Sequence, residues 1–282
     1  LSHANLDSNA EAVVATLALT DTDRAVTTLE PTYSYGLSVL HSHLAAGAGV
    51  VLTDLSVNDP GFKDIVRRHG VTTMAAVPYT FELLDRLGTS VLQTPSLRQL
   101  TCAGGRLPAA TARRYAELGE RLGFELVVMY GATEATARMA VLPPHLAASH
   151  PGTVGHAVPG GAFRLDAVNA EGVGDLVYTG PNVMLGYAES PSDLARGRDL
   201  DELVTGDRAR FTPEGLVEIV GRRAQIAKVH GLRVDLADVD RELEEAGIDA
   251  VTVALDGALG VAAVGVPAHV ANAVVVAATG LP

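Results

Sequence analysis

The chain has 282 residues, and 48% of them are hydrophobic, which is enough for the core of one large domain or two smaller ones. The net charge of −12 argues against a general nucleic-acid-binding surface, because such a surface needs basic patches. No apolar run is long enough to span a bilayer, and no basic segment followed by an apolar one indicates a signal peptide. The single cysteine, Cys102, excludes an internal disulfide and favours the reducing cytoplasm. It lies in an apolar stretch, so we expect a small core residue there.

Helices and strands alternate through the first 150 residues. Ser2 is a good N-cap for a first helix, predicted over residues 3–18. Further helices are predicted over residues 37–46, 60–69, 81–87 and 108–122, and a ring-rich loop over residues 31–36. Short apolar strands are predicted over residues 25–29, 50–52, 71–77, 97–103 and 126–129. Strand–helix units of this length predict an α/β fold with layered, mostly parallel sheets and flanking helices.

The pattern changes after residue 150. Residues 151–221 are rich in Gly and Pro, with short strands expected over residues 175–179, 208–211 and 216–220. They predict a small β-rich, barrel-like section of the same large domain. Residues 222–282 predict the start of a small α+β lid domain, with helices over residues 236–246 and 269–279 and a hairpin between them at residues 250–266.

The stretch from Leu126 to Glu134 is the clearest candidate site. A buried strand ends in an aromatic residue, a glycine, and then a hydroxyl beside a carboxylate, and ligands bind at this end of strands in α/β proteins. Tyr130 offers a ring face, and Gly131 allows a close backbone approach. Thr133 can hydrogen-bond an anion, and Glu134 can hold a hard cation such as Mg²⁺. An ordinary turn after a strand is the alternative interpretation of so short a signal.

Four more short motifs combine glycine with charged residues. Each alone is also typical of a solvated turn. The motif at residues 205–207 places a carboxylate after an expected glycine turn, where it can accept hydrogen bonds from a diol. The last motif places cations around a glycine in an expected loop. The motifs are Ala103-Gly104-Gly105-Arg106, Thr205-Gly206-Asp207, Gly221-Arg222-Arg223 and Lys228-Val229-His230-Gly231-Leu232-Arg233.

In this order and spacing the motifs resemble those of the adenylate-forming ligases, which include acyl-CoA synthetases, luciferases and the adenylation domains of peptide synthetases. The segment from Gly174 to Tyr187 also resembles the family segment that precedes the Thr-Gly-Asp motif. The resemblance covers nearly the whole chain. It implies that a carboxylate attacks the α-phosphate of ATP, that pyrophosphate leaves, and that a thiol then takes the acyl group from acyl-AMP.

The resemblance also implies roles for individual residues. Tyr130 would stack on adenine, Thr133 would bind the α-phosphate, and Glu134 would hold Mg²⁺. Asp207 would accept both ribose hydroxyls, with Arg222 reaching the ribose as well. Lys228 is the expected catalytic cation. The remaining expected nucleotide-site residues are Gly104, Gly105, Arg106, Gly131 and Ala132. The expected wall of the acyl pocket is Tyr33, Ser34, Tyr35 and Gly36.

The implied ligands are ATP or AMP, Mg²⁺ and a small carboxylic acid, and the thiol acceptor is either CoA or the phosphopantetheine of an acyl or peptidyl carrier protein. Neither a nucleic acid nor a membrane is an expected partner. His230 lies in the lysine motif, whose loop in relatives lines the tunnel for the acceptor, and is a further candidate.

The sequence departs from the family pattern in places. The phosphate-gripping loop that should precede Leu1 is absent, as is the catalytic lysine near the family's C-terminus, and the hinge residue is Ala224. The ring-rich loop has Glu30-Pro31-Thr32 where relatives place Pro followed by His or an aromatic residue. We therefore expect an internal piece of a ligase that recognises adenosine but turns over little or not at all. The alternatives are a non-catalytic remnant that binds a partner, and a nucleotide-dependent oxidoreductase, which the lack of a Gly-x-Gly-x-x-Gly turn disfavours.

Overall fold

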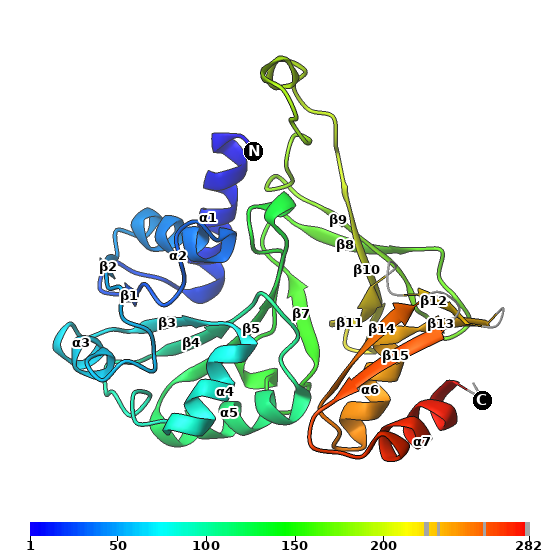
Figure 1. Ribbon diagram of the computed structural model, residues 1–282. Coiled ribbons are helices and arrows are strands. Elements are labelled where there is room, and N and C mark those ends of the chain that lie inside the picture. Colours follow the sequence, from blue (N-terminus) through cyan, green and yellow to red (C-terminus); the bar gives the residue numbers. More distant parts are fainter. Residues whose placement is uncertain (223–225, 230–231, 256–257, 280–282) are drawn as a thin grey trace. The chain divides into compact units, whose positions relative to one another are not determined.

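The structure, a computed structural model, describes residues 1–222, 226–229, 232–255 and 258–279 (Figure 1). The chain divides into two units. The first comprises Leu1–Arg164, Val177–Leu203 and Phe211–Glu218, and the second comprises Leu165–Leu176, Val204–Arg210 and Ile219–Pro282. The predicted division at residues 150 and 221 stays a prediction.

A twisted sheet with the strand order β2-β1-β3-β4-β5-β6-β7 forms the centre of the first unit (Figure 1). Strands β1 to β5 are parallel to their neighbours, and β6 and β7 join them antiparallel. The predicted α/β fold with a mostly parallel sheet is confirmed. The strands are β1 (Arg24–Val26), β2 (Gly49–Val51), β3 (Thr73–Ala76), β4 (Gln99–Cys102), β5 (Glu125–Tyr130), β6 (Ala140–Val141) and β7 (Thr153–Ala157).

The helices of this unit follow the predicted order. The cap of the first helix is confirmed, since the Ser2 Oγ accepts from the Asn5 backbone N–H at 3.2 Å and Asn5 Oδ1 accepts from the Ser2 N–H at 2.8 Å. The second helix begins at Ser34, three residues before the predicted start. The helices are α1 (His3–Leu17), α2 (Ser34–Ala45), α3 (Phe62–Arg68), α4 (Pro78–Leu87) and α5 (Ala109–Leu122), with short 3-10 turns η1 (Thr133–Ala135), η2 (Pro144–Leu146) and η3 (Pro191–Ala195).

Alternate side chains of β5 divide the core into two layers. Leu126 and Val128 pack in a cluster with residues of α3, α4 and α5, whereas Val127 and Met129 pack with residues of α1 and α2. A strand with helices on both faces must be apolar on both sides, which explains why its sequence is a continuous apolar run rather than an alternating one.

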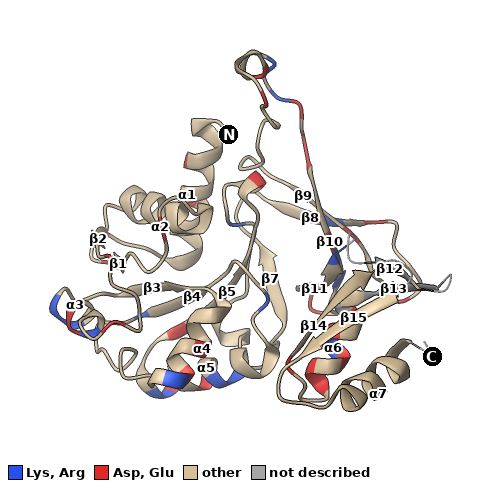
Figure 2. Ribbon diagram, in the orientation of Figure 1, with Lys and Arg blue, Asp and Glu red and all other residues tan. Residues whose placement is uncertain are grey.

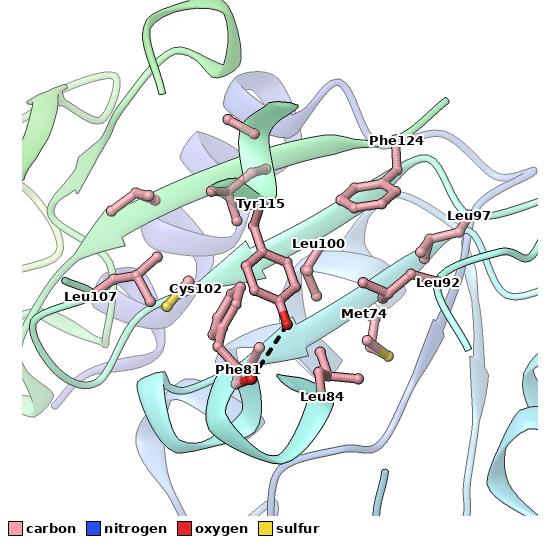
Figure 3. Packing of buried hydrophobic residues seen from close by; sticks show 14 of the residues in the cluster. Met74, Phe81, Leu84, Leu92, Leu97, Leu100, Cys102, Leu107, Tyr115 and Phe124 are labelled. Atoms are coloured by element: carbon pink, nitrogen blue, oxygen red, sulfur yellow. Dashed lines mark hydrogen bonds between the residues drawn. The ribbon is translucent and has the colours of Figure 1, made fainter. Parts of the chain in front are cut away.

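Figure 3 shows the cluster beneath α4 and α5. The rings of Phe81 and Tyr115 meet edge to face with centroids 4.7 Å apart, and the Tyr115 hydroxyl donates to the Phe81 carbonyl oxygen at 3.3 Å. Cys102 is buried in the same cluster, and this burial raises the pKa of its thiol to about 12. The thiol is therefore neutral at physiological pH, and the predicted core role of Cys102 is confirmed.

Several helices carry clusters of charged residues, as the blue and red segments of α3, α5 and α6 show in Figure 2. On α5, for example, Arg113, Arg114 and Glu117 are exposed while Ala112 and Tyr115 face the core. This division is the amphipathic pattern of a helix that covers a sheet.

Strands β8 (Ala162–Asp166), β9 (Gly174–Thr179), β10 (Leu203–Phe211) and β11 (Val217–Arg222) are hydrogen-bonded neighbours in that order. A tight turn joins the last two, in which the Thr212 N–H donates to the Leu216 carbonyl at 2.9 Å and the Gly215 N–H donates to the Thr212 carbonyl at 2.9 Å.

Where the structure describes it, the remainder of the second unit consists of two antiparallel strand pairs and two helices. The hairpin predicted at residues 250–266 pairs Ala250–Leu255 with Ala258–Ala263. The elements are β12 (Ile226–Val229), β13 (Leu232–Asp235), α6 (Leu236–Glu245), β14 (Ala250–Leu255), β15 (Ala258–Ala263) and α7 (Ala268–Thr279). Val229, Val239, Leu243 and Val275 are among the buried residues of its core. Within the described ranges, no helix is both long and apolar enough to cross a membrane.

His43 is buried between α2 and the sheet, and both of its ring nitrogens have close polar neighbours. Its Nδ1 lies 2.8 Å from the Val39 carbonyl oxygen and its Nε2 lies 2.7 Å from Thr73 Oγ1. Desolvation lowers the pKa of His43, and the positive charges of Arg138 and Arg98 lower it further. The hydrogen bond to Val39 and the charge of Asp23 oppose this shift without cancelling it.

We therefore expect the free energy of unfolding to fall as the pH drops below about 6.5, the ordinary histidine pKa. In that window the unfolded chain binds a proton at residue 43 and the folded chain does not, so each pH unit costs up to about 1.4 kcal/mol until the lowered folded pKa is reached. Urea unfolding of the chain and of the His43→Gln variant at pH 8, 6.5 and 5 measures how the free energy of unfolding depends on pH. The variant should lose that part of the slope, while His41→Gln on the same helix should keep it. Equal slopes for the chain and His43→Gln would contradict the assignment.

Candidate functional site

The carboxyl ends of β3, β4 and β5 lie side by side, because the three strands are parallel neighbours. Their next residues are the start of α4 at Pro78, the pair Gly104-Gly105, and the loop from Gly131 onward. A side chain on Gly105 would place its Cβ 3.1 Å from the Pro78 ring, so these two strand ends are in close contact. The three segments that follow these strands therefore lie at the same edge of the sheet, where the sequence predicted a site.

Position 104 requires a glycine for two reasons, its backbone conformation and the closeness of a neighbouring side chain. Its φ is +81°, a left-handed conformation that favours glycine. A Cβ there would lie 2.3 Å from the hydroxyl of Tyr33, which comes from the segment before α2. The Tyr33 hydroxyl therefore lies directly against Gly104. The residue itself is 39% exposed. Arg106, two residues on, is exposed in the connection to α5.

The loop from Tyr130 to Glu134 is tight and internally fixed. Tyr130 is the last residue of β5, and its carbonyl accepts from the Met139 N–H at 2.8 Å as β6 begins to pair. The Ala132 carbonyl accepts from the Ala135 N–H at 3.0 Å and the Ala137 N–H at 3.1 Å. The ring of Tyr130 lies 6.3 Å from that of Phe163, centroid to centroid, which supports one edge of it.

Thr133 and Glu134 each contact a segment that is distant in sequence. The hydroxyls of Thr133 and Ser34, the first residue of α2, are 3.0 Å apart. The structure thus brings together a residue predicted for the phosphate site and one predicted for the acyl pocket. Thr133 is exposed and Glu134 is half-buried, so both remain accessible to a ligand.

Tyr187 was not predicted as a site residue. Its hydroxyl donates to Glu134 Oε1 at 2.8 Å, and the nearby Met184 N–H donates to the Glu134 carbonyl at 2.7 Å. The hydrogen bond to Glu134 raises the pKa of Tyr187, so the phenol stays a donor at neutral pH. The sequence signal was available, since Tyr187 ends the family-like segment that begins at Gly174.

Two expected pocket residues lie elsewhere than predicted. Residues 31–36 were expected to form a loop, but Ser34, Tyr35 and Gly36 form the first turn of α2. Tyr35 is only 3% exposed, and its hydroxyl lies 2.7 Å from Thr101 Oγ1 in the core, so it does not line an open surface. Gly36 is also buried, and a Cβ there would lie 2.3 Å from the Glu30 carbonyl oxygen.

Arg138 is a second residue that was not among the predicted site residues. Its side chain is 1% exposed, and its guanidinium carbon lies 5.2 Å from the centre of the Tyr35 ring. Desolvation lowers its pKa, and its Nε and Nη1 have no hydrogen-bond partner in the part of the chain that the structure describes. The available signal was a charged residue inside the apolar run from Ala135 to Val141.

Asp207 and Arg222 belong to the second unit and form an ion pair there. Arg222 Nε donates to Asp207 Oδ1 at 2.9 Å, and Asp207 is 6% exposed. The predicted glycine turn at residues 205–207 is wrong: β10 runs through all three, with Gly206 at φ +78° inside the strand. The Thr205 hydroxyl donates to the Leu176 carbonyl at 2.8 Å and accepts from the Asp207 N–H at 3.1 Å, which fixes this segment. Gly221 and Arg222 are likewise the end of β11 rather than residues that follow a strand.

Lys228 and Arg233 were expected in a loop but lie in facing strands. They are Cα partners in the hairpin of β12 and β13, so the backbone sets them across from each other. The side chain of Lys228, together with Ala224 and His230, lies outside the described part of the chain.

Glu134 is the residue predicted to hold a divalent cation. Among the described residues, no group of three or more His, Cys, Asp and Glu side chains is placed to hold a metal ion. Mg²⁺ in nucleotide sites is commonly held by one or two carboxylates together with substrate phosphates. One half-buried carboxylate, with one of its oxygens hydrogen-bonded by Tyr187, is such a donor.

Comparison with known proteins identifies the family to which the chain belongs. Residues 1–188 match the family described as AMP-binding enzyme, and the chain belongs to this family of adenylate-forming ligases. Pyochelin synthetase PchE of Pseudomonas aeruginosa strain UCBPP-PA14 is 29% identical over 94% of the chain, which covers 19% of that protein. Oxalate–CoA ligase of Arabidopsis thaliana is 28% identical over 86% of the chain and 48% of the ligase.

Solved structures agree with the fold. O-succinylbenzoate coenzyme A synthetase (MenE) of Bacillus subtilis, in complex with ATP and magnesium ion, is 23% identical with a TM-score of 0.74, over 93% of this chain and 56% of that one. VinN in complex with L-aspartate is 28% identical with a TM-score of 0.62, over 75% of this chain and 53% of that one. The chain thus spans about half of these solved structures and of the oxalate–CoA ligase.

Proposed function

We propose that this chain carries the adenosine-binding part of an acyl-adenylate-forming ligase. In that reaction a carboxylate oxygen attacks the α-phosphorus of ATP and pyrophosphate leaves, giving acyl-AMP. A thiol sulfur then attacks the acyl carbonyl, and AMP leaves as the thioester forms. The observation that supports this best is the fixed loop after β5, which presents a ring, a hydroxyl and a carboxylate within five residues at the carboxyl edge of the sheet.

The roles of the individual residues are part of this proposal. Tyr130 stacks on adenine, with Gly104, Gly105, Arg106, Gly131 and Ala132 around it. Thr133 donates a hydrogen bond from its hydroxyl to the α-phosphate. Hydrogen-bond donors placed where charge develops are the main source of catalysis in such reactions. Bound Mg²⁺ would neutralise phosphate charge, with Glu134 as its protein ligand. In the second unit, Asp207 accepts from the ribose hydroxyls beside Arg222, and Lys228 supplies a cation.

The substrate is a small carboxylic acid, and the acceptor thiol is CoA or the phosphopantetheine of a carrier protein. Both kinds of acceptor are consistent with relatives whose names include a CoA ligase and a peptide synthetase. The ring of Tyr33 and the hydroxyl of Ser34 are the accessible residues at the proposed acyl pocket. We further propose the cytoplasm as the compartment.

Calorimetric titration with AMP tests the proposal. The chain should bind AMP and not NAD, and Tyr130→Leu should weaken AMP by about 5- to 150-fold, since stacking of a base on an aromatic ring is worth about 1–3 kcal/mol. Tyr130→Phe keeps the ring and should keep most of the affinity. A chain that is folded but binds neither AMP nor ATP would instead support the non-catalytic, partner-binding alternative, and binding of NAD would support the oxidoreductase. Trapping of acyl-AMP with hydroxylamine then measures whether the chain turns over.

A further inference from the structure

Tyr187 makes a polar contact with Glu134 although its side chain has little other packing. Its side chain is 68% exposed, so the ring contributes little to the core. The hydroxyl nevertheless donates to Glu134 Oε1 at 2.8 Å, across 53 residues of sequence. A side chain that packs against little and holds a carboxylate has its main effect on that carboxylate.

The backbone on both sides of this contact is fixed. The Met184 N–H donates to the Glu134 carbonyl at 2.7 Å, which joins the two segments directly. The Leu185 carbonyl accepts from the Asp199 N–H at 2.7 Å, and Arg196 Nη2 donates to the Tyr187 carbonyl at 3.2 Å. Tyr187 therefore extends from an anchored loop, and its hydroxyl restricts the rotation of the Glu134 carboxylate.

From this geometry we infer that Tyr187 is a positioning residue, whose hydroxyl holds the Glu134 carboxylate in the orientation that binds the divalent cation of a nucleotide. The inference rests on the proposed function. Only one carboxylate oxygen receives this hydrogen bond, which leaves the other oxygen to face a cation. Hydrogen bonds to a metal ligand set its orientation, and their removal typically costs about 10- to 100-fold in metal affinity.

The test measures ATP binding by calorimetry across a series of MgCl₂ concentrations, using the full chain. In Tyr187→Phe, the MgCl₂ concentration that gives half of the enhancement of ATP affinity should rise by about tenfold. AMP affinity without Mg²⁺ should stay within about twofold, because the cation takes no part in it. Tyr79→Phe removes the hydroxyl of another exposed tyrosine, on α4, and should leave both measurements unchanged.

A second variant separates positioning from a general structural effect. Glu134→Gln should abolish most of the Mg²⁺ enhancement, and adding Tyr187→Phe to it should change nothing further, because the two residues act through one carboxylate. An unchanged Mg²⁺ midpoint in Tyr187→Phe, or an additional loss in the double variant, would overturn the inference. If the chain binds AMP but Mg²⁺ has no effect on ATP, this inference and the proposed role of Glu134 fail, whereas the proposed adenosine-binding function stands. If it binds neither nucleotide, the proposed function fails and the inference fails with it.

Discussion

Replacing Gly131 with alanine is expected to destabilise the first unit by roughly 3 kcal/mol or more, at the upper end of what overpacking costs. The new Cβ would lie 1.6 Å from the Ala137 carbonyl oxygen and 2.5 Å from the Ala137 carbonyl carbon. These are backbone atoms, and the Ala137 N–H is itself bonded to the Ala132 carbonyl at 3.1 Å, so they cannot move aside without breaking the loop. The same loop carries Tyr130, Thr133 and Glu134, and AMP binding should fall with stability.

Urea denaturation followed by circular dichroism measures the effect, with Gly61→Ala as the matched control. A Cβ on Gly61 would approach only the end of the flexible Leu55 side chain, at 3.2 Å, and its φ of −87° suits alanine. That variant should stay within about 1 kcal/mol of the parent chain. A Gly131→Ala chain as stable as Gly61→Ala would show that the loop after β5 is not packed as described.

Replacing Asp207 with asparagine is expected to weaken AMP binding by about 10- to 100-fold. Hydrogen bonds to a charged group contribute about 1.5–3 kcal/mol, and 1.4 kcal/mol corresponds to a tenfold change in affinity. Asparagine keeps the shape of the side chain but loses the charge that pairs with Arg222 at 2.9 Å. The Asp207 side chain is 8% exposed and that of Arg222 is 68% exposed, so the carboxylate is buried while solvent still screens the ion pair.

The ligand offers the control for this prediction. 2′,3′-Dideoxyadenosine monophosphate lacks both ribose hydroxyls and should bind the parent chain about as weakly as AMP binds Asp207→Asn. Combining the variant with the dideoxy ligand should produce little further loss, since both changes remove the same contact. Fully additive losses would mean that Asp207 acts away from the ribose, and the residue role would then have to be reassigned.

The alternation of strands and helices was predictable because it depends on local patterns. Strand β5 is a continuous apolar run, and α1 begins at a serine whose cap the structure contains. The errors arose where pairing with a neighbouring strand overrode a local turn or loop signal. Gly206 resembles a turn residue in sequence but lies inside β10, and Lys228 lies in a hairpin rather than in a loop. Ser34 was placed in a loop because the rings beside it have no strong helical preference.

The sequence by itself determined the family and predicted the segment of chain that is proposed to carry its chemistry, since each motif is contiguous and its residue types limit what it can bind. Only the tertiary structure decided which of those residues meet. The hydroxyls of Ser34 and Thr133 are 3.0 Å apart across 99 residues, and Tyr187 reaches Glu134 across 53. The burial of Tyr35 beside Arg138 was likewise not predictable from the sequence. Periodicity and propensity describe neighbours along the chain, whereas these contacts depend on how parallel strands and the loops at their ends pack in space.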